Sequence, residues 1–296
     1  MTLLLTGADG QVGREIQRLA LQDDHPIVAL NRSGLDITDP GAVRQVVQET
    51  QPAMIVNAAA YTAVDKAEDE PALAFRVNRD GAANLAQAAG EAGIPLVHLS
   101  TDYVFDGTSP RPYLETDPVA PIGVYGHSKW EGEEAVRKRL HHHLIIRVSW
   151  VFGVHGNNFV KTMLRLAGER EALRVVADQR GGPTYAGHIA ALILHLYERT
   201  REKRVTGWGT YHFCGSPVTS WHAFAEAIVR TGRQKGLLDR SVTVHPITTA
   251  DYPTRARRPA NSALDCRKIE AYFGIHPKAW QTGLEDMLER LAKEAA

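Results

Sequence analysis

A short apolar run that breaks into three evenly spaced glycines constrains this chain more than any other feature. Residues 3–5 are consecutive leucines, typical of a buried strand, and apolar residues recur at helical steps from Val12 onward. Gly7, Gly10 and Gly13 lie at the junction, so a tight turn is expected to join strand to helix. Such a turn suits a phosphate-bearing ligand, because bare backbone and the free amides of a helix start meet there. An ordinary glycine-rich turn remains an alternative.

The pattern that follows predicts a parallel sheet. Four further apolar runs are predicted strands: residues 26–30, 52–57, 94–99 and 144–148. Helical periodicity separates several of them, as in residues 40–51 and 71–92. Nearly continuous apolar strands that alternate with helices indicate a parallel sheet covered on both faces. With right-handed crossovers, the predicted fold is a Rossmann-like, doubly wound α/β fold.

The second half of the chain is expected to form a smaller α/β lobe that binds substrate. Residues 1–150 would be mainly the dinucleotide-binding domain and residues 151–296 mainly the substrate lobe, interleaved with the first. Helices are predicted in this half near residues 220–231, 265–273 and 280–293.

Charge and cysteine content exclude several classes of protein. The 34 basic and 34 acidic side chains balance, which argues against nucleic acid or an anionic membrane as partner. Cys214 and Cys266 are far apart in the sequence and lack zinc-ligand spacing, which argues against a disulfide framework and a structural zinc site. With no apolar run long enough for a membrane span, we expect a cytoplasmic protein, a monomer or homodimer, that acts on a small molecule.

The end of the second strand sets the expected cofactor preference. Asn31, Arg32 and Ser33 stand where an acidic residue would bind a ribose 2′-hydroxyl, and Arg32 can instead pair with a 2′-phosphate. NADPH is therefore favoured over NADH, although Arg32 could also be a solvated loop charge. Residues 35–37 are predicted as a short edge segment, with Asp36 able to meet the adenine amino group.

Tyr125 and Lys129 form the clearest chemical pair. Four residues apart on a helix, they share one face, so an ammonium can sit beside the phenol and lower its pKa from about 10. A hydroxyl at the end of the fourth strand, from Ser100 or Thr101, could bond the same substrate oxygen. This arrangement suits reduction of a carbonyl.

These motifs carry a family resemblance. The glycine loop, a Ser/Thr at a strand end and Tyr-x-x-x-Lys resemble the extended short-chain dehydrogenase/reductase family. Further blocks resemble its dTDP-4-dehydrorhamnose reductase branch: residues 57–68, 99–107, 149–152, 156–163 and 258–262. The resemblance implies reduction of the C4 ketone of dTDP-4-dehydro-L-rhamnose to dTDP-L-rhamnose by hydride from NADPH.

The resemblance also implies roles for individual residues. Tyr125 would be the proton donor, Lys129 would hold the nicotinamide ribose, and Thr101 would orient the ketone. Cofactor contacts are expected from Gly7, Gly10, Gln11, Val12, Arg32, Asp36, Ile37, Ala60, Tyr61, Thr62, Tyr125 and Lys129. Thr101, Asp102 and Trp150 would face the sugar, although a core role for the tryptophan is the ordinary one.

Three polar residues of the second half are candidates for the substrate diphosphate. Asn158 and Lys161 open a predicted helix, and Arg258 could neutralise phosphate. Each could equally be a helix cap or a surface charge.

No metal is predicted. Some relatives in the resembled branch share a magnesium ion at a dimer contact, and Glu15 matches one ligand, but Gly187 stands where another would be needed. The three histidines at 141–143 are not expected to bind a metal, because consecutive strand residues point to opposite faces and cannot converge on one ion. They are expected to form a solvated turn between a charged helix and a strand.

Two other functions stay open from the sequence. One is a noncatalytic, dinucleotide-binding regulatory subunit, which would not need Thr101, Tyr125 and Lys129 together. The other is a nucleotide-sugar epimerase or dehydratase, which recycles its bound cofactor.

Overall fold

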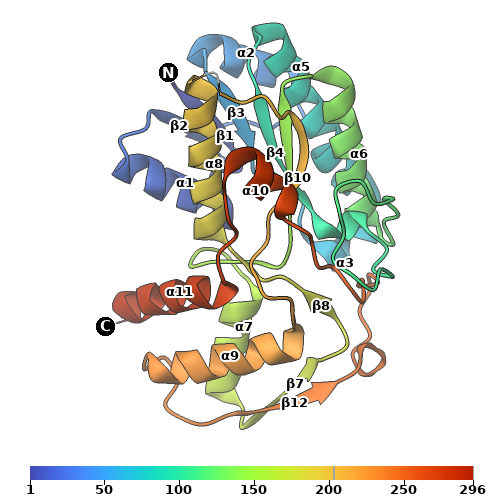
Figure 1. Ribbon diagram of the computed structural model, residues 1–296, viewed down its shortest axis with the longest axis vertical. Helices are drawn as coiled ribbons and strands as arrows, with labels where there is room; N and C mark the ends of the chain where they lie inside the picture. Colours follow the sequence, from blue (N-terminus) through green and yellow to red (C-terminus); the bar gives the residue numbers. More distant parts are fainter. Residues whose placement is uncertain (203, 296) are drawn as a thin grey trace.

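The computed structural model describes residues 1–202 and 204–295, and its largest element is a six-stranded parallel sheet (Figure 1). The strands lie in the order β2-β1-β3-β4-β5-β10, with bounds β1 (Leu3–Thr6), β2 (Ile27–Leu30), β3 (Met54–Asn57), β4 (Leu96–Thr101), β5 (His143–Val148) and β10 (Gly209–His212). The predicted Rossmann-like α/β fold is confirmed. Strand order reverses between β1 and β3, which opens a crevice at their carboxyl ends.

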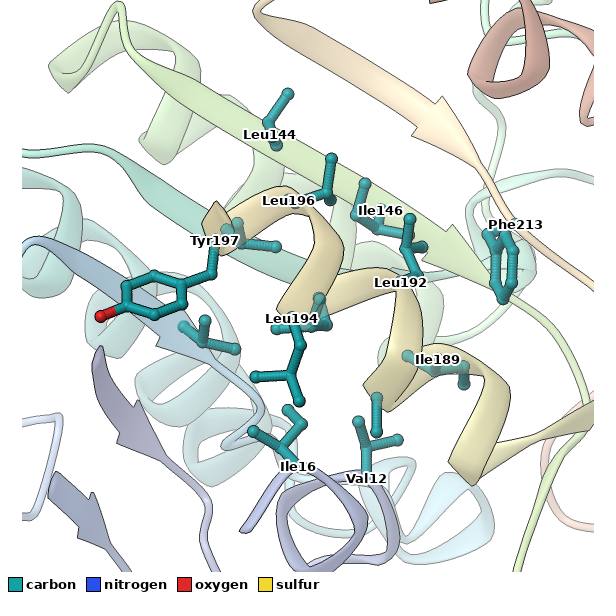
Figure 2. Packing of buried hydrophobic residues seen from close by; sticks show 14 of the residues in the cluster. Val12, Ile16, Leu144, Ile146, Ile189, Leu192, Leu194, Leu196, Tyr197 and Phe213 are labelled. Atoms are coloured by element: carbon teal, nitrogen blue, oxygen red, sulfur yellow. The ribbon is translucent and has the colours of Figure 1, made fainter. Parts of the chain in front are cut away.

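Helices α1 (Gln11–Gln22) and α8 (Ala186–Arg201) cover one face of this sheet. Leu3 and Leu5 of β1 point to this face, because alternate strand residues point the same way. Figure 2 shows the apolar side chains of α8 between β5 and α1, with Ile16 near Leu194. Helix α8 follows residue 150, so the second half of the chain completes the core of the first.

The other face is covered by α2 (Pro40–Thr50), α5 (Ala82–Ala92) and α6 (Val124–Arg139), which pack on Leu4 and Ile55. The helix predicted over residues 71–92 is present but not uniform. It begins as α4 (Pro71–Phe75), widens into a π-type turn (Arg76–Gly81) and continues as α5. Gly93 ends it at a φ of +66°, a conformation that glycine adopts without strain.

The smaller lobe lies below the sheet in Figure 1. It has its own apolar core. Its helices are α7 (Phe159–Glu169), α9 (Trp221–Gln234) and α11 (Trp280–Ala295). Three two-stranded pairs accompany them: β7 (Ala172–Val176) with β12 (Thr243–Ile247), β8 (Arg180–Gly181) with β11 (Thr219–Ser220), and β6 (Val151–Phe152) with β9 (Thr184–Tyr185). Helix α10 (Arg267–Phe273) returns to pack against β10 of the large sheet.

Two local predictions are wrong. Residues 35–37 form no strand; the Asp36 carboxylate instead accepts hydrogen bonds from the amide and hydroxyl of Thr38, which turns the chain. His143 is buried as the first residue of β5, while His141 and His142 are exposed. In the described ranges, none of the helices has both the length and the apolar character to cross a bilayer.

Candidate active site

A cleft of about 760 Å³ lies at the carboxyl ends of β1, β3, β4 and β5. All twelve residues expected to contact the cofactor line it: Gly7, Gly10, Gln11, Val12, Arg32, Asp36, Ile37, Ala60, Tyr61, Thr62, Tyr125 and Lys129. Thr101, Asp102 and Trp150 line it as well. Parallel strands end at the same edge of the sheet, so segments far apart in sequence meet there.

The glycine loop fits a diphosphate. Gly7 has a φ of +74°, and a Cβ there would lie 2.4 Å from the amide nitrogen of Ala59. A Cβ on Gly13 would lie 2.3 Å from the carbonyl oxygen of Gly7, so α1 can approach the strand only with glycine at this position. Helix α1 starts after Gly10 with no side chain capping its first amides. Those amides are free to bind an anion.

Asn78 is a positioning residue that the sequence analysis missed. It is 2% exposed and lies in the π-type turn, where its Oδ1 accepts from the amide of Tyr61 at 2.8 Å. Its Nδ2 donates to the carbonyl of Tyr61 at 3.1 Å and to Oγ of Ser128 at 2.9 Å. This one side chain therefore ties the loop after β3 to helix α6. No local signal distinguishes Asn78, because charged residues flank it and Asn84 follows on the same helix.

Helix α6 places Tyr125 and Lys129 on the cleft, as the spacing predicts. A Cβ on Gly126 would lie 2.1 Å from the carbonyl oxygen of Tyr103, so glycine here lets the helix approach the end of β4. Glu68 accepts a hydrogen bond from the amide of Val124 at 2.9 Å and so satisfies a free donor at the start of α6.

The predicted lowering of the Tyr125 pKa is wrong. Burial raises it to about 12, because a phenolate loses its hydration there. The Lys129 ammonium donates instead to the carbonyl of Leu99 at 2.6 Å. Lys129 is 2% exposed, and burial lowers its pKa to about 8 against the opposing charge of Glu133. Near neutral pH the site thus holds a protonated phenol and an ammonium.

Thr101 ends β4 and Asp102 follows it, and both line the cleft. The Thr101 hydroxyl donates to Oδ1 of Asp102 at 3.0 Å and accepts from the amide of Tyr103 at 3.2 Å. Asp102 is 2% exposed, and burial raises the pKa of its carboxyl to about 6. The pair combines a fixed hydroxyl with a carboxyl that titrates close to neutrality.

Trp150 is held in an unusual conformation. Its φ is +46°, a region that bulky residues rarely adopt. The indole Nε1 donates to Oγ of Ser262 at 3.1 Å, and the ring stacks on Trp221 with centroids 3.5 Å apart and planes 7° from parallel. A Cβ on Gly181 would lie 2.5 Å from the indole. Trp221 therefore covers one face of the ring, and it too was missed in the sequence.

Asn158, Lys161 and Arg258 do not line the cleft. Asn158 caps α7 by accepting from the amide of Lys161, and its Nδ2 donates to Oε1 of Gln11 at 2.9 Å. Lys161 donates to the carbonyl of Val154, and Arg258 pairs with Asp65 at 2.7 Å. Asn158 thus links the small lobe to the glycine loop.

The surroundings of Glu15 do not fit a divalent cation. Its buried carboxylate pairs through Oε1 with Arg290 on α11 at 2.7 Å and through Oε2 with Arg18 at 2.8 Å. Both oxygens of this carboxylate already accept hydrogen bonds from guanidinium groups, which a metal ion would have to displace. The contact instead joins α1 of the large lobe to α11 of the small one.

The sheet, the glycine loop and the Tyr125–Lys129 pair define a short-chain dehydrogenase/reductase. The family model described as the RmlD substrate binding domain matches residues 1–293. The chain belongs to this family.

Named relatives cover nearly the whole chain. It is 47% identical over 286 residues to the dTDP-4-dehydrorhamnose reductase of Aggregatibacter actinomycetemcomitans, covering 96% of this chain and 97% of that protein. It is 44% identical over 295 residues to the same-named protein of Sinorhizobium fredii, covering 99% of each. The crystal structure of dTDP-4-dehydrorhamnose reductase from Bacillus anthracis in complex with NADP has a TM-score of 0.91 at 38% identity, covering 98% of this chain and 99% of that one.

Proposed function

We propose that this protein reduces the C4 ketone of dTDP-4-dehydro-L-rhamnose to dTDP-L-rhamnose at the expense of NADPH. The observation that carries the proposal is the meeting of Thr101, Tyr125 and Lys129 in the cleft that the glycine loop also lines. Relatives named for this reaction, at 47% and 44% identity, identify the substrate. When bound, NADPH supplies the hydride that the carbonyl carbon accepts.

Three side chains act on the carbonyl oxygen or near it. Tyr125, neutral at physiological pH because burial raises its pKa, gives its phenolic proton to the oxygen as the hydride arrives. Thr101 fixes the direction of the carbonyl through its hydroxyl. Lys129 binds the ribose hydroxyls beside the nicotinamide, and its positive charge stabilises the Tyr125 phenolate that the proton transfer leaves behind.

The remaining cleft residues divide between the two ligands. The loop at Gly10, Gln11 and Val12 receives the cofactor diphosphate, and Arg32 receives the 2′-phosphate. The other expected cofactor contacts are Gly7, Asp36, Ile37, Ala60, Tyr61 and Thr62. Asp102 and Trp150 contact the deoxysugar. For Asn158, Lys161 and Arg258, which do not line the cleft, the role at the substrate diphosphate rests on the family resemblance alone.

The test is NADPH consumption by the purified protein with a panel of 4-ketosugar nucleotides that differ in base and sugar. We expect turnover with dTDP-4-dehydro-L-rhamnose and little with UDP or GDP ketosugars. Absence of turnover with every substrate, together with a copurifying enzyme, would favour the regulatory subunit. Tightly retained NAD⁺ with no net NADPH consumption would favour the epimerase or dehydratase.

A further inference from the structure

A buried polar cluster lies behind the cleft, between β4, β5 and α6. Oε1 of Glu133 accepts from Oγ of Ser100 at 2.6 Å and from Nε of Arg147 at 2.9 Å. Oε2 accepts from Nη2 of Arg147 at 2.7 Å and from Nη2 of Arg137 at 2.6 Å. Glu133 is 0% and Arg147 1% exposed. Four hydrogen bonds fix the carboxylate in one orientation.

The cluster touches the proposed catalytic machinery at two points. Glu133 is one helical turn after Lys129 on α6, so both side chains share a face. Ser100 directly precedes Thr101 at the end of β4. Lys129 is itself buried, with its hydrogen bond going to the uncharged carbonyl of Leu99. A buried ammonium without an anion nearby tends to lose its proton, because burial removes its hydration.

We propose that Glu133 is a positioning residue for the reduction. Its carboxylate keeps Lys129 charged at the cleft and, through Ser100, holds the end of β4 that presents Thr101. The inference rests on the proposed function of Lys129 and Thr101. A stabilising role alone would not require charges here, since apolar side chains of similar volume often replace a buried ion pair without loss of stability.

Other groups near Lys129 leave its charge dependent on Glu133. His98 on β4 is neutral, because burial and the charge of Lys129 hold its pKa well below the usual range. His212 on β10 lies 3.4 Å from Arg147, and burial lowers its pKa to about 3. Tyr125 on α6 is neutral as well. Above pH 7, the remaining charges facing this region belong to Glu133, its arginine partners and Asp102 after β4, whose pKa burial raises to about 6 and which none of the variants below changes.

The first test uses the double variant E133Q/R147M. E133Q alone would leave the buried Arg147 guanidinium without its main anion, whereas the double variant replaces the pair with neutral side chains of similar size. The measurement is the pH dependence of NADPH binding, followed by cofactor fluorescence, with kcat/KM for the ketosugar beside it. We expect near-normal binding at acidic pH and an alkaline loss that begins about one pH unit lower, a tenfold effect in the shifted range. An alkaline limb identical to that of the unmodified protein would overturn the proposal.

The second variant, R137M, keeps the test decisive if the double variant does not fold. Arg137 lies at the rim of the cluster, with its side chain 26% exposed, and it contributes positive charge next to Glu133. Removing it should leave Glu133 more able to stabilise the Lys129 ammonium, so the alkaline limb should move to higher pH. No movement, or movement to lower pH, would contradict the proposal. NADPH binding reports on Lys129 even if the protein turns over no ketosugar, so failure of the proposed function is a separate result.

Discussion

The carboxamide of Asn78 forms two hydrogen bonds with the main chain of Tyr61. Its Oδ1 accepts from the amide at 2.8 Å, and its Nδ2 donates to the carbonyl at 3.1 Å. A third bond, to Ser128, reaches the helix that carries Tyr125. One buried side chain therefore couples a cofactor-lining loop to the proposed catalytic helix.

Asn78→Ala should weaken both folding and cofactor binding. The partly buried amide of Tyr61 would lose its acceptor, which costs about 1–3 kcal/mol of unfolding free energy. We expect a similar order of loss in NADPH affinity, because the loop that lines the cleft is no longer fixed. Denaturant unfolding and NADPH titration measure the two effects. Gln87→Ala, on the exposed side of the same helix, is the matched control and should change neither. Unaltered NADPH affinity in the Asn78 variant would show that the loop holds its shape unaided.

Tyr125→Phe should separate chemistry from binding. The variant keeps the ring but removes the proton that the ketone oxygen must receive, so kcat should fall by about 10²–10⁴. NADPH affinity should stay within about twofold, since the ring still packs at the same place. Tyr103→Phe is the control for the loss of a tyrosine hydroxyl close to the site. Tyr103 packs edge-on against Tyr125, with ring centroids 5.5 Å apart. Steady-state kinetics and cofactor titration decide the matter, and turnover retained by the Tyr125 variant would rule out its role as donor.

Asp102 should make stability depend on pH in an unusual direction. Its pKa is raised by burial to about 6, whereas an unfolded aspartate has a pKa of about 3.9. The folded state binds this proton more tightly, so the stabilisation is complete below pH 4 and is lost as pH rises through 6. The free energy of unfolding of the unmodified protein, relative to Asp102→Asn, should therefore fall by about 3 kcal/mol between pH 4 and 7.

Asp106→Asn provides the control of opposite sign. The Thr108 amide and the Tyr113 hydroxyl donate to this carboxylate and lower its pKa. Its contribution to stability is therefore present at neutral pH and lost on acidification. Denaturant unfolding across the pH range measures both differences. A flat difference for Asp102 would mean that its carboxyl is better solvated than its burial indicates.

Trp221→Ala should weaken the binding of the ketosugar more than the binding of the cofactor. Trp221 does not line the cleft, but its ring stacks on the indole of Trp150, which does line it. An aromatic pair contributes about 0.5–1.5 kcal/mol, so the KM for the ketosugar should rise about two- to tenfold while NADPH affinity is kept. Trp208→Ala is the control, because Trp208 does not line the cleft and its ring packs against His142. Equal losses for both ligands would show a general disturbance of the small lobe.

Local patterns were sufficient for five of the six strands of the sheet and for the cofactor cleft, whereas β10 was not predicted. Leu3 to Leu5 and the glycines at 7, 10 and 13 predict a strand, a turn and a helix from neighbours alone. Since parallel strands end at one edge of the sheet, the residues after β1, β3 and β4 were expected to lie at the same edge. The roles of the individual cleft residues are still predictions.

The sequence by itself determined the fold class, the phosphate loop and the spacing of Tyr125 and Lys129, because each depends on residues a few positions apart. Only the tertiary structure decided the pKa values of these groups and the side chains that pack around them. The Glu133–Arg147 pair, the Trp150–Trp221 stack and the high pKa of Tyr125 come from packing between separate elements and from the exclusion of water. Burial and long-range contacts leave no local pattern in the chain, so their energetic consequences appear only once it has folded.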